Sequence, residues 1–172
     1  MSRNHLPFRA VNRREEAGFQ PDLQRHHLLP RQLLHRRCFA ALFERIGAGR
    51  LGFDDFRRNG LLLPSSESAA LRTGLPLHCG PHRDYNALVI ERVGQIEAGW
   101  TRPGGRDEAG YEALARLALL QRALRRRLLA APPDSGRCAA ALLSSRDPAR
   151  RAEDFAALDA LAEELWPATE TG

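Results

Sequence analysis

Apolar residues recur at helical spacing in three parts of the chain. Over residues 31–46 they fall at every fourth position from Leu34 to Ile46, which predicts an amphipathic helix. Similar spacing predicts a helix from Pro81 to about residue 98, because proline suits the first turn of a helix. A longer helix is expected over residues 111–131, where two following prolines would stop it.

Two short segments have the pattern of strands instead. Residues 23–30 form an extended run that ends at proline, and Asn59-Gly60 is a strong turn signal before three leucines and Pro64. This order of elements divides the chain into four regions. We expect a polar N-terminal arm over residues 1–18, a core over residues 19–99, a linker over residues 100–110 and a helical C-terminal region over residues 111–172.

The composition indicates a basic protein of one domain, or one domain with an appendage. The chain has 172 residues and a formal net charge of +5, which favours contact with polyanions such as nucleic acid. All 26 basic residues are arginine, a bias that we attribute to general composition, while particular arginines can still bind phosphate. The three cysteines form no CxxC pair, so a disulfide framework is not indicated. We expect no signal peptide and no membrane span, and therefore a cytoplasmic protein or an effector delivered to another cell.

Four of the six histidines lie in two short patches, and the first patch is the pair His26–His27. Adjacent residues on a strand point to opposite faces, so one ring can bind a metal ion while the other stays free. A free imidazole is well suited to take a proton from water, and a metal ion beside a phosphate neutralises developing charge. The pair therefore indicates metal-assisted phosphodiester hydrolysis. The alternative is a chance pair on a surface strand.

The second patch, residues 77–86, holds His78 and His82 four positions apart. On a helix this spacing puts both rings on one face. Because a Gly-Pro pair lies between them, we expect the helix to start there, with His78 in the entry turn and His82 in the first turn. Asn86 would follow one turn later on the same face.

Three segments, HHLLP, NGLLLP and LHCGPHRDYNALV, occur in this order along the chain. In this combination the chain resembles the AHH branch of the HNH/endonuclease VII nuclease superfamily, over roughly residues 20–98. The resemblance implies an α+β fold with a ββα-metal core, in which a short β-hairpin and a helix hold one divalent ion. Here helices elaborate that core, an insertion separates the two strands, and Arg25 replaces the alanine of the family motif.

The resemblance also implies roles for individual residues. His26 and His82 would be metal ligands, with His78 as a further ligand, and His27 would be the general base. Asn59 would steady the base histidine, Arg83 would contact the scissile phosphate, and Tyr85 would support the site. Asn86 would support the site or bind the ion itself.

The expected activity is that of a single-metal endonuclease acting on nucleic acid, with DNA favoured over RNA as the substrate. Mg or Mn would serve turnover, whereas an imidazole site would bind Zn or Ni more tightly. The resemblance adds a bacterial toxin role with an immunity protein as partner, and a homodimer stays open. The alternative is a non-enzymatic, zinc-stabilised module that binds nucleic acid or protein, in which Cys79 joins the histidines in a closed site.

Overall fold

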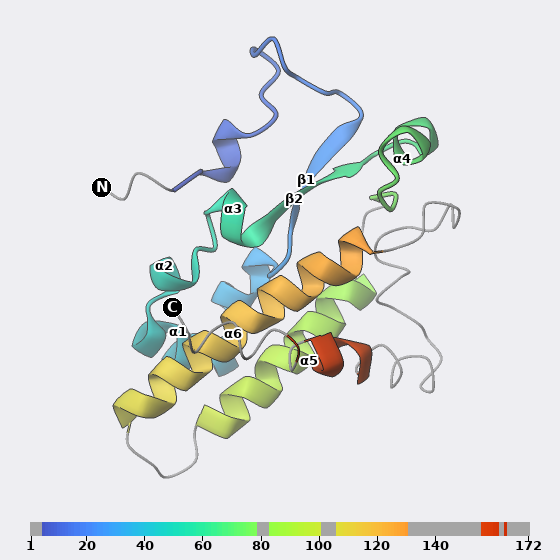
Figure 1. Cartoon of the computed structure of the whole chain (residues 1–172). Helices are drawn as coiled ribbons and strands as arrows, with labels where there is room; N and C mark the ends of the chain where they lie inside the picture. The colour runs from blue at the N-terminus through green and yellow to red at the C-terminus, as the bar shows by residue number, and fades with distance from the viewer. Residues whose placement is uncertain (1–4, 79–82, 101–105, 131–155, 162–163, 165–172) are drawn as a thin grey trace.

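The computed structural model describes residues 5–78, 83–100, 106–130, 156–161 and 164. A two-stranded hairpin lies above a pair of long helices, with shorter helices packed at their side (Figure 1). Helices therefore dominate the described part of the chain, and the expected combination of a short hairpin with helices is present.

The hairpin joins two strands that are far apart in the sequence. β1 (Leu23–His27) pairs antiparallel with β2 (Gly60–Pro64), and His26 lies opposite Leu61 while His27 lies opposite Gly60. β2 is almost entirely buried because α4 (Glu67–Thr73) and α3 (Phe56–Asn59) contact it. Both predicted strands, and the helical insertion between them, are confirmed.

The insertion differs from its predicted form. In place of one helix over residues 31–46, the chain forms two 3-10 turns, η2 (Arg31–His35) and η3 (Arg37–Phe39), before α1 (Ala40–Ile46). Arg36 is extended between the two turns, with φ −84° and ψ 121°. This break lets Leu33 and Phe39 both reach the core, whereas Cys38, expected on the buried stripe, is exposed. The short helix α2 (Ala48–Leu51) then leads toward α3.

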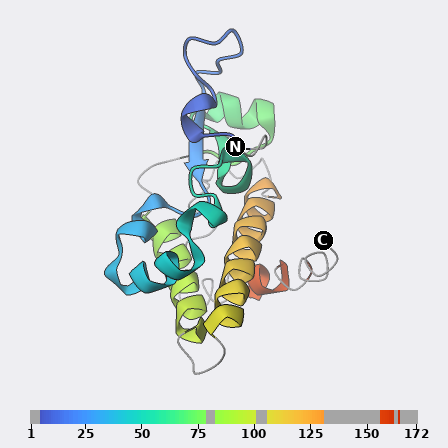
Figure 2. The same cartoon turned by 90° about the vertical axis from the view of Figure 1, so that its left-hand side faces the viewer.

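Two long helices lie beneath the hairpin in the view of Figure 1. α5 (Arg83–Trp100) and α6 (Arg106–Leu129) pack side by side in both views (Figures 1 and 2). The expectation of a linker over residues 100–110 is wrong for residues 106–110, which form the first turns of α6. Tyr111, taken as the start of this helix, lies inside it. Asp and Glu early in a helix interact favourably with its dipole, which allows the helix to begin earlier than its apolar stripe.

One continuous hydrophobic core joins the hairpin, the insertion and both long helices. Leu28 and Leu63 come from the strand region, Leu42 from α1, Val89 from α5 and Leu124 from α6, and all five are essentially inaccessible to solvent. Leu158, near the C-terminal end of the described residues, also lies in this core. Within the described residues, no helix is both long and apolar enough to span a membrane.

The N-terminal segment contains the short helical turn η1 (Phe8–Ala10) and packs against the insertion. Pro7 forms a β-bridge with Asp55, and the Phe56 amide donates to the Leu6 carbonyl at 2.7 Å. Phe8 is buried. This segment is thereby fixed beside β1, which positions it next to the histidine pair.

Candidate active site

Two histidines meet on the buried side of β1. His26 is only 5% exposed, and its Nδ1 atom lies 3.2 Å from Nε2 of His78, which follows β2 and α4 in the chain. The other ring nitrogen of His78, Nδ1, lies 3.0 Å from the side-chain oxygen of Gln24. Because a carbonyl oxygen only accepts, this contact places the His78 proton on Nδ1. Nε2 then presents a lone pair toward His26.

This donor set suits a metal ion. Two imidazole ligands with bonds of about 2.0–2.1 Å in tetrahedral geometry place their nitrogens roughly 3.3 Å apart, close to the observed spacing. The distance of 3.2 Å between the two nitrogens is also that of a hydrogen bond. The same ring positions therefore suit a direct hydrogen bond between His26 and His78 or a metal ion bound by both. Within the described residues no group of three potential metal-binding side chains occurs. His82, the third expected ligand, lies outside the described residues.

His27 faces the opposite side of β1, as the alternation of a strand requires. Its ring stacks on Phe8 with centroids 3.7 Å apart and an interplanar angle of 2°. Burial lowers the pKa of His27, and the nearby Arg31 and Arg25 lower it further, whereas Asp54 opposes them. His27 is therefore neutral at pH 7 and able to accept a proton.

Asn59 is fully buried at the end of α3, directly before β2. Its amide donates to the Leu29 carbonyl at 3.0 Å and accepts from the Leu29 amide at 2.8 Å. It also donates to the Phe53 carbonyl at 3.2 Å. The resemblance implied that Asn59 steadies the base histidine. In the structure its side chain binds the backbone two residues beyond His27 rather than the imidazole, so any effect on His27 runs through the end of β1.

Tyr85 on α5 closes the buried side of the site. Its hydroxyl donates to the Leu28 carbonyl at 2.6 Å, and its ring meets His26 edge-on with centroids 5.0 Å apart. Tyr85 is 1% exposed, and burial raises the pKa of its hydroxyl, which therefore stays protonated and keeps donating. Tyr85 therefore contacts both the ring of His26 and the backbone that follows the histidine pair, and its supporting role in the site stays a prediction.

The remaining predicted residues lie at the start of α5 or just before it. Arg83 is the first residue of α5 and is exposed, whereas Asn86 is half-buried three residues later. Cys79, like His82, lies outside the described residues. The structure therefore brings together His26, His78 and Tyr85, and sets His27 on the other face of the strand.

Sequence reasoning missed three residues around the site: Phe8, Gln24 and Gln121. Phe8 was assigned to the arm, although the apolar run Leu6-Pro7-Phe8 is a signal that this segment packs. Gln121 is a buried polar residue on α6 whose amide donates to the Asn59 side chain at 3.2 Å and to the Leu51 carbonyl at 3.3 Å. The sequence could have indicated that Gln121 is buried, because it falls between Leu117 and Leu124 on the apolar stripe of this helix. Nothing in the sequence singles out Gln24.

Comparison with known proteins identifies the family of this chain. The sequence model of the AHH family, described as a nuclease family of the HNH/ENDO VII superfamily with conserved AHH, matches residues 8–124. No curated protein matches the chain, and no solved structure does. The family match spans the hairpin, the insertion, α5 and most of α6, and a two-stranded hairpin with helices is consistent with the ββα-metal nuclease fold. The chain therefore belongs to the AHH nuclease family of the HNH/ENDO VII superfamily.

Proposed function

We propose that this nuclease is a metal-dependent endonuclease that hydrolyses phosphodiester bonds of DNA with a single divalent ion. The observation that supports the proposal best is the arrangement of three imidazoles around β1. His26 and His78 face each other at 3.2 Å on one side, and His27 lies neutral on the other. In this arrangement His26 and His78 would bind the metal ion, and His27 would act separately as the base.

His26 and His78 would hold the ion, with His82 as a third ligand and Asn86 as a support. The ion would neutralise charge on the phosphate and on the leaving oxygen. Gln24 keeps His78 in the tautomer that offers Nε2. Tyr85 and Asn59 hold the backbone at Leu28 and Leu29, directly after the histidine pair.

His27 would act as the general base. Its neutral ring takes a proton from the attacking water, a bond forms between the water oxygen and phosphorus, and the bond to the 3′ oxygen breaks. The leaving 3′ oxygen would take a proton from solvent water, so the products would be a 5′-phosphate and a 3′-hydroxyl. Stacking on Phe8 fixes the plane of the His27 ring, so the attacking water would approach a ring nitrogen at the edge of that plane. Arg83, exposed at the start of α5, would contact that phosphate.

The activity is tested with purified protein on plasmid DNA and total RNA, with Mg, Mn, Ni or Zn supplied in turn and EDTA as control. We expect cutting of DNA with Mg or Mn, none with EDTA, and products that a ligase rejoins because they carry 5′-phosphates. Cleavage of RNA alone would contradict the substrate assignment. Cleavage that survives EDTA would contradict the role of the metal.

A toxin role, with an immunity protein as partner, remains a prediction drawn from the family resemblance. We expect induced expression of the chain to stop the growth of a bacterial host, and expression of His27→Ala to leave growth unchanged. Equal growth with both proteins would contradict a toxin role without bearing on the nuclease activity itself.

A further inference from the structure

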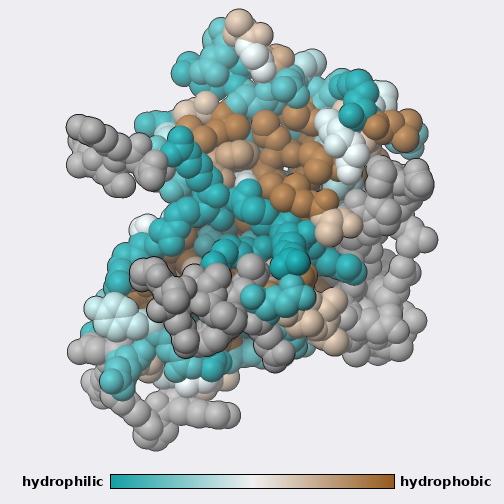
Figure 3. All heavy atoms as spheres, in the orientation of Figure 1, coloured by the Kyte–Doolittle hydropathy of each residue, from teal (hydrophilic) through white to brown (hydrophobic). Residues whose placement is uncertain are grey.

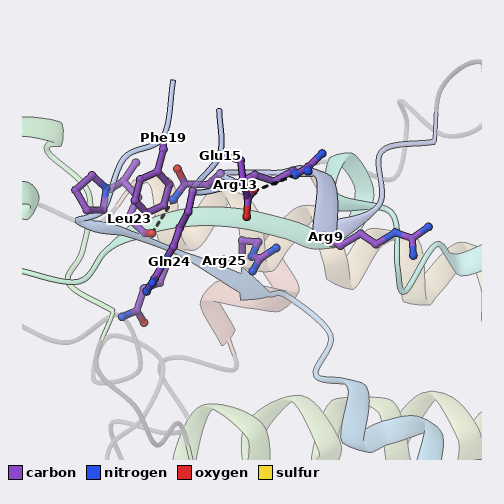
Figure 4. Close-up of a pocket in the computed structure, with 10 residues that line it drawn as sticks. Arg9, Arg13, Glu15, Phe19, Leu23, Gln24 and Arg25 are labelled. Carbon is purple, nitrogen blue, oxygen red and sulfur yellow. Dashed lines mark hydrogen bonds and ion pairs between the residues drawn. The ribbon is translucent and has the colours of Figure 1, made fainter. Parts of the chain in front are cut away.

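A groove lined with arginine lies beside the histidine site, between the N-terminal segment and β1. It has a volume of about 700 Å³, and its walls carry four arginines and one glutamate. The arginines are Arg9, Arg13, Arg14 and Arg25. In Figure 4, Arg9, Arg13 and Arg25 lie toward one end of the groove, and Phe19, Leu23 and Gln24 lie toward the other.

The charge of the groove is not balanced by its own carboxylates. Arg13 pairs with Glu15 at 3.5 Å and with Glu16 at 3.7 Å, all on exposed side chains. Arg25 donates to the Phe8 carbonyl at 2.8 Å, which leaves its positive charge uncompensated. Arg9 and Arg14 are exposed, and neither forms an ion pair with any described residue. Three cationic side chains are therefore available to an anionic ligand, which arginine binds through its planar fork.

The loop that carries Arg13 and Arg14 is held in one conformation by hydrogen bonds of the Asn12 side chain. Asn12 adopts a left-handed conformation with φ 51°, which is uncommon for a residue other than glycine. Its side chain donates to the carbonyls of Gln20 and Leu23 and accepts from the Gln20 amide, each at 2.8–2.9 Å. These bonds tie both ends of the loop to the start of β1. The groove is consequently preorganised, which lowers the entropic cost of binding.

Gln24 joins the groove to the histidine site. It lines the groove, and its side-chain oxygen contacts His78 Nδ1 at 3.0 Å. His78 in turn faces His26 at 3.2 Å. Gln24 is therefore the side chain that separates the groove from the histidine pair. A polynucleotide backbone bound at the histidines would continue into the groove. In Figure 3 the top of the molecule is mostly hydrophilic, with a broad hydrophobic area directly beneath it.

We infer that this groove binds the phosphate backbone of the polynucleotide substrate next to the cleaved bond, with Arg9, Arg14 and Arg25 as the phosphate contacts. The inference rests on the proposed nuclease function and adds the site that holds the flanking nucleotides. Phe19, which is half-buried, lines the groove at the Gln24 end.

The test measures the affinity of a fluorescent DNA oligonucleotide in EDTA, where cleavage is absent, at several salt concentrations. The groove variant is Arg9→Gln with Arg14→Gln, since both side chains are exposed and neither forms an ion pair with any described residue. The control, Arg50→Gln with Arg116→Gln, removes equal charge from α2 and α6, where Arg50 lies over Tyr111 and Arg116 pairs with Glu112. Thermal unfolding verifies that both variants are folded.

We expect the groove variant to bind the oligonucleotide at least about tenfold more weakly near 0.1 M salt. The slope of a plot of log Kd against log salt concentration should fall by almost two, because two phosphate contacts are lost. The control should change affinity by less than about twofold. Equal affinities in the groove variant and the control would overturn the inference. Cleavage by the unmodified protein is measured separately with metal, so a protein that binds through the groove but never cuts would contradict the proposed function alone.

Discussion

At the residue scale, the site depends on which nitrogen of His78 carries the proton. The contact with the Gln24 side-chain oxygen assigns that proton to Nδ1 and leaves Nε2 facing His26. Partners that orient a histidine ligand in this way raise its basicity and fix its ring. Gln24 is therefore expected to control metal affinity without touching the ion.

Gln24→Leu keeps the approximate size of the side chain and removes the acceptor. We expect the affinity for Zn, measured by calorimetric titration, to fall about 10- to 100-fold while the protein stays folded. Gln32→Leu is the matched control, because Gln32 is also exposed but lies in η2. Zinc affinity that is unchanged in Gln24→Leu would show that His78 is not a ligand, or that its tautomer is set otherwise.

The sequence identifies the histidine residues but not their mutual arrangement. His26, His27 and His78 can be identified because each lies in a short sequence motif. The alternation of side chains along a strand also predicts that the rings of His26 and His27 point to opposite faces. Phe8, Gln24 and Gln121 act through contacts with residues 19, 54 and 62 positions away in the sequence. No local pattern encodes such contacts. Asn59 shows the same limit, because the predicted Asn59-Gly60 turn is instead the end of α3 and the start of β2, and the Asn59 amide binds Leu29 rather than the histidine.

At the scale of elements, the hairpin depends on the close approach of α3 to β2. Gly60 pairs with His27 in the register, and a Cβ atom at Gly60 would collide with the ring of Phe56. That ring cannot move freely, because it packs edge-on against Phe8 with centroids 5.1 Å apart. Phe8 in turn stacks on His27. The glycine therefore allows α3, the N-terminal segment and the base histidine to lie together.

Gly60→Ala is expected to destabilise the fold by about 1–3 kcal/mol through overpacking, as measured by urea unfolding. The control is Gly94→Ala in α5, where an added Cβ meets no atom within 4 Å. That change should stabilise the protein by about 0.5–1 kcal/mol, because alanine favours the helix over glycine. Equal free energies of unfolding for Gly60→Ala and the unmodified protein would contradict the tight contact at Phe56.

Long elements follow from periodicity more reliably than short ones in this chain. The spacing of apolar residues predicts α5 and the body of α6, since each has a continuous buried stripe. It fails over residues 31–39, where two 3-10 turns bring Leu33 and Phe39 inward with a different period. Tertiary packing overrides the local pattern there.

At the scale of the whole molecule, α6 belongs to the core that supports the site. Its residues in that core are Ala113, Leu117, Leu120, Ala123, Leu124 and Leu128. Gln121 on the same helix reaches Asn59 at the base of the hairpin. The family match likewise extends to residue 124. The expected boundary before residue 111 came from glycine and proline content, which marks a turn between two helices as readily as a boundary between domains.

A chain that ends at residue 105 is expected not to fold. Its four missing leucines each contribute about 1.5–3 kcal/mol by burial, which together rivals the usual total stability of 5–15 kcal/mol. Circular dichroism during thermal unfolding should show no cooperative transition for this chain. A chain ending at residue 130 retains α6 and should unfold cooperatively. Cooperative unfolding of the shorter chain would restore the interpretation of α6 as an appendage.

The central claim is that β1 places a metal ligand and a base on its two faces. The most direct test measures zinc stoichiometry and Mg- or Mn-dependent DNA cleavage in parallel for His26→Ala, His27→Ala and the exposed control His35→Ala. We predict that His27→Ala binds one ion and loses at least about 100-fold in cleavage rate. His26→Ala should lose both properties and His35→Ala neither. Unchanged cleavage by folded His27→Ala, or full metal binding by His26→Ala, would contradict the claim.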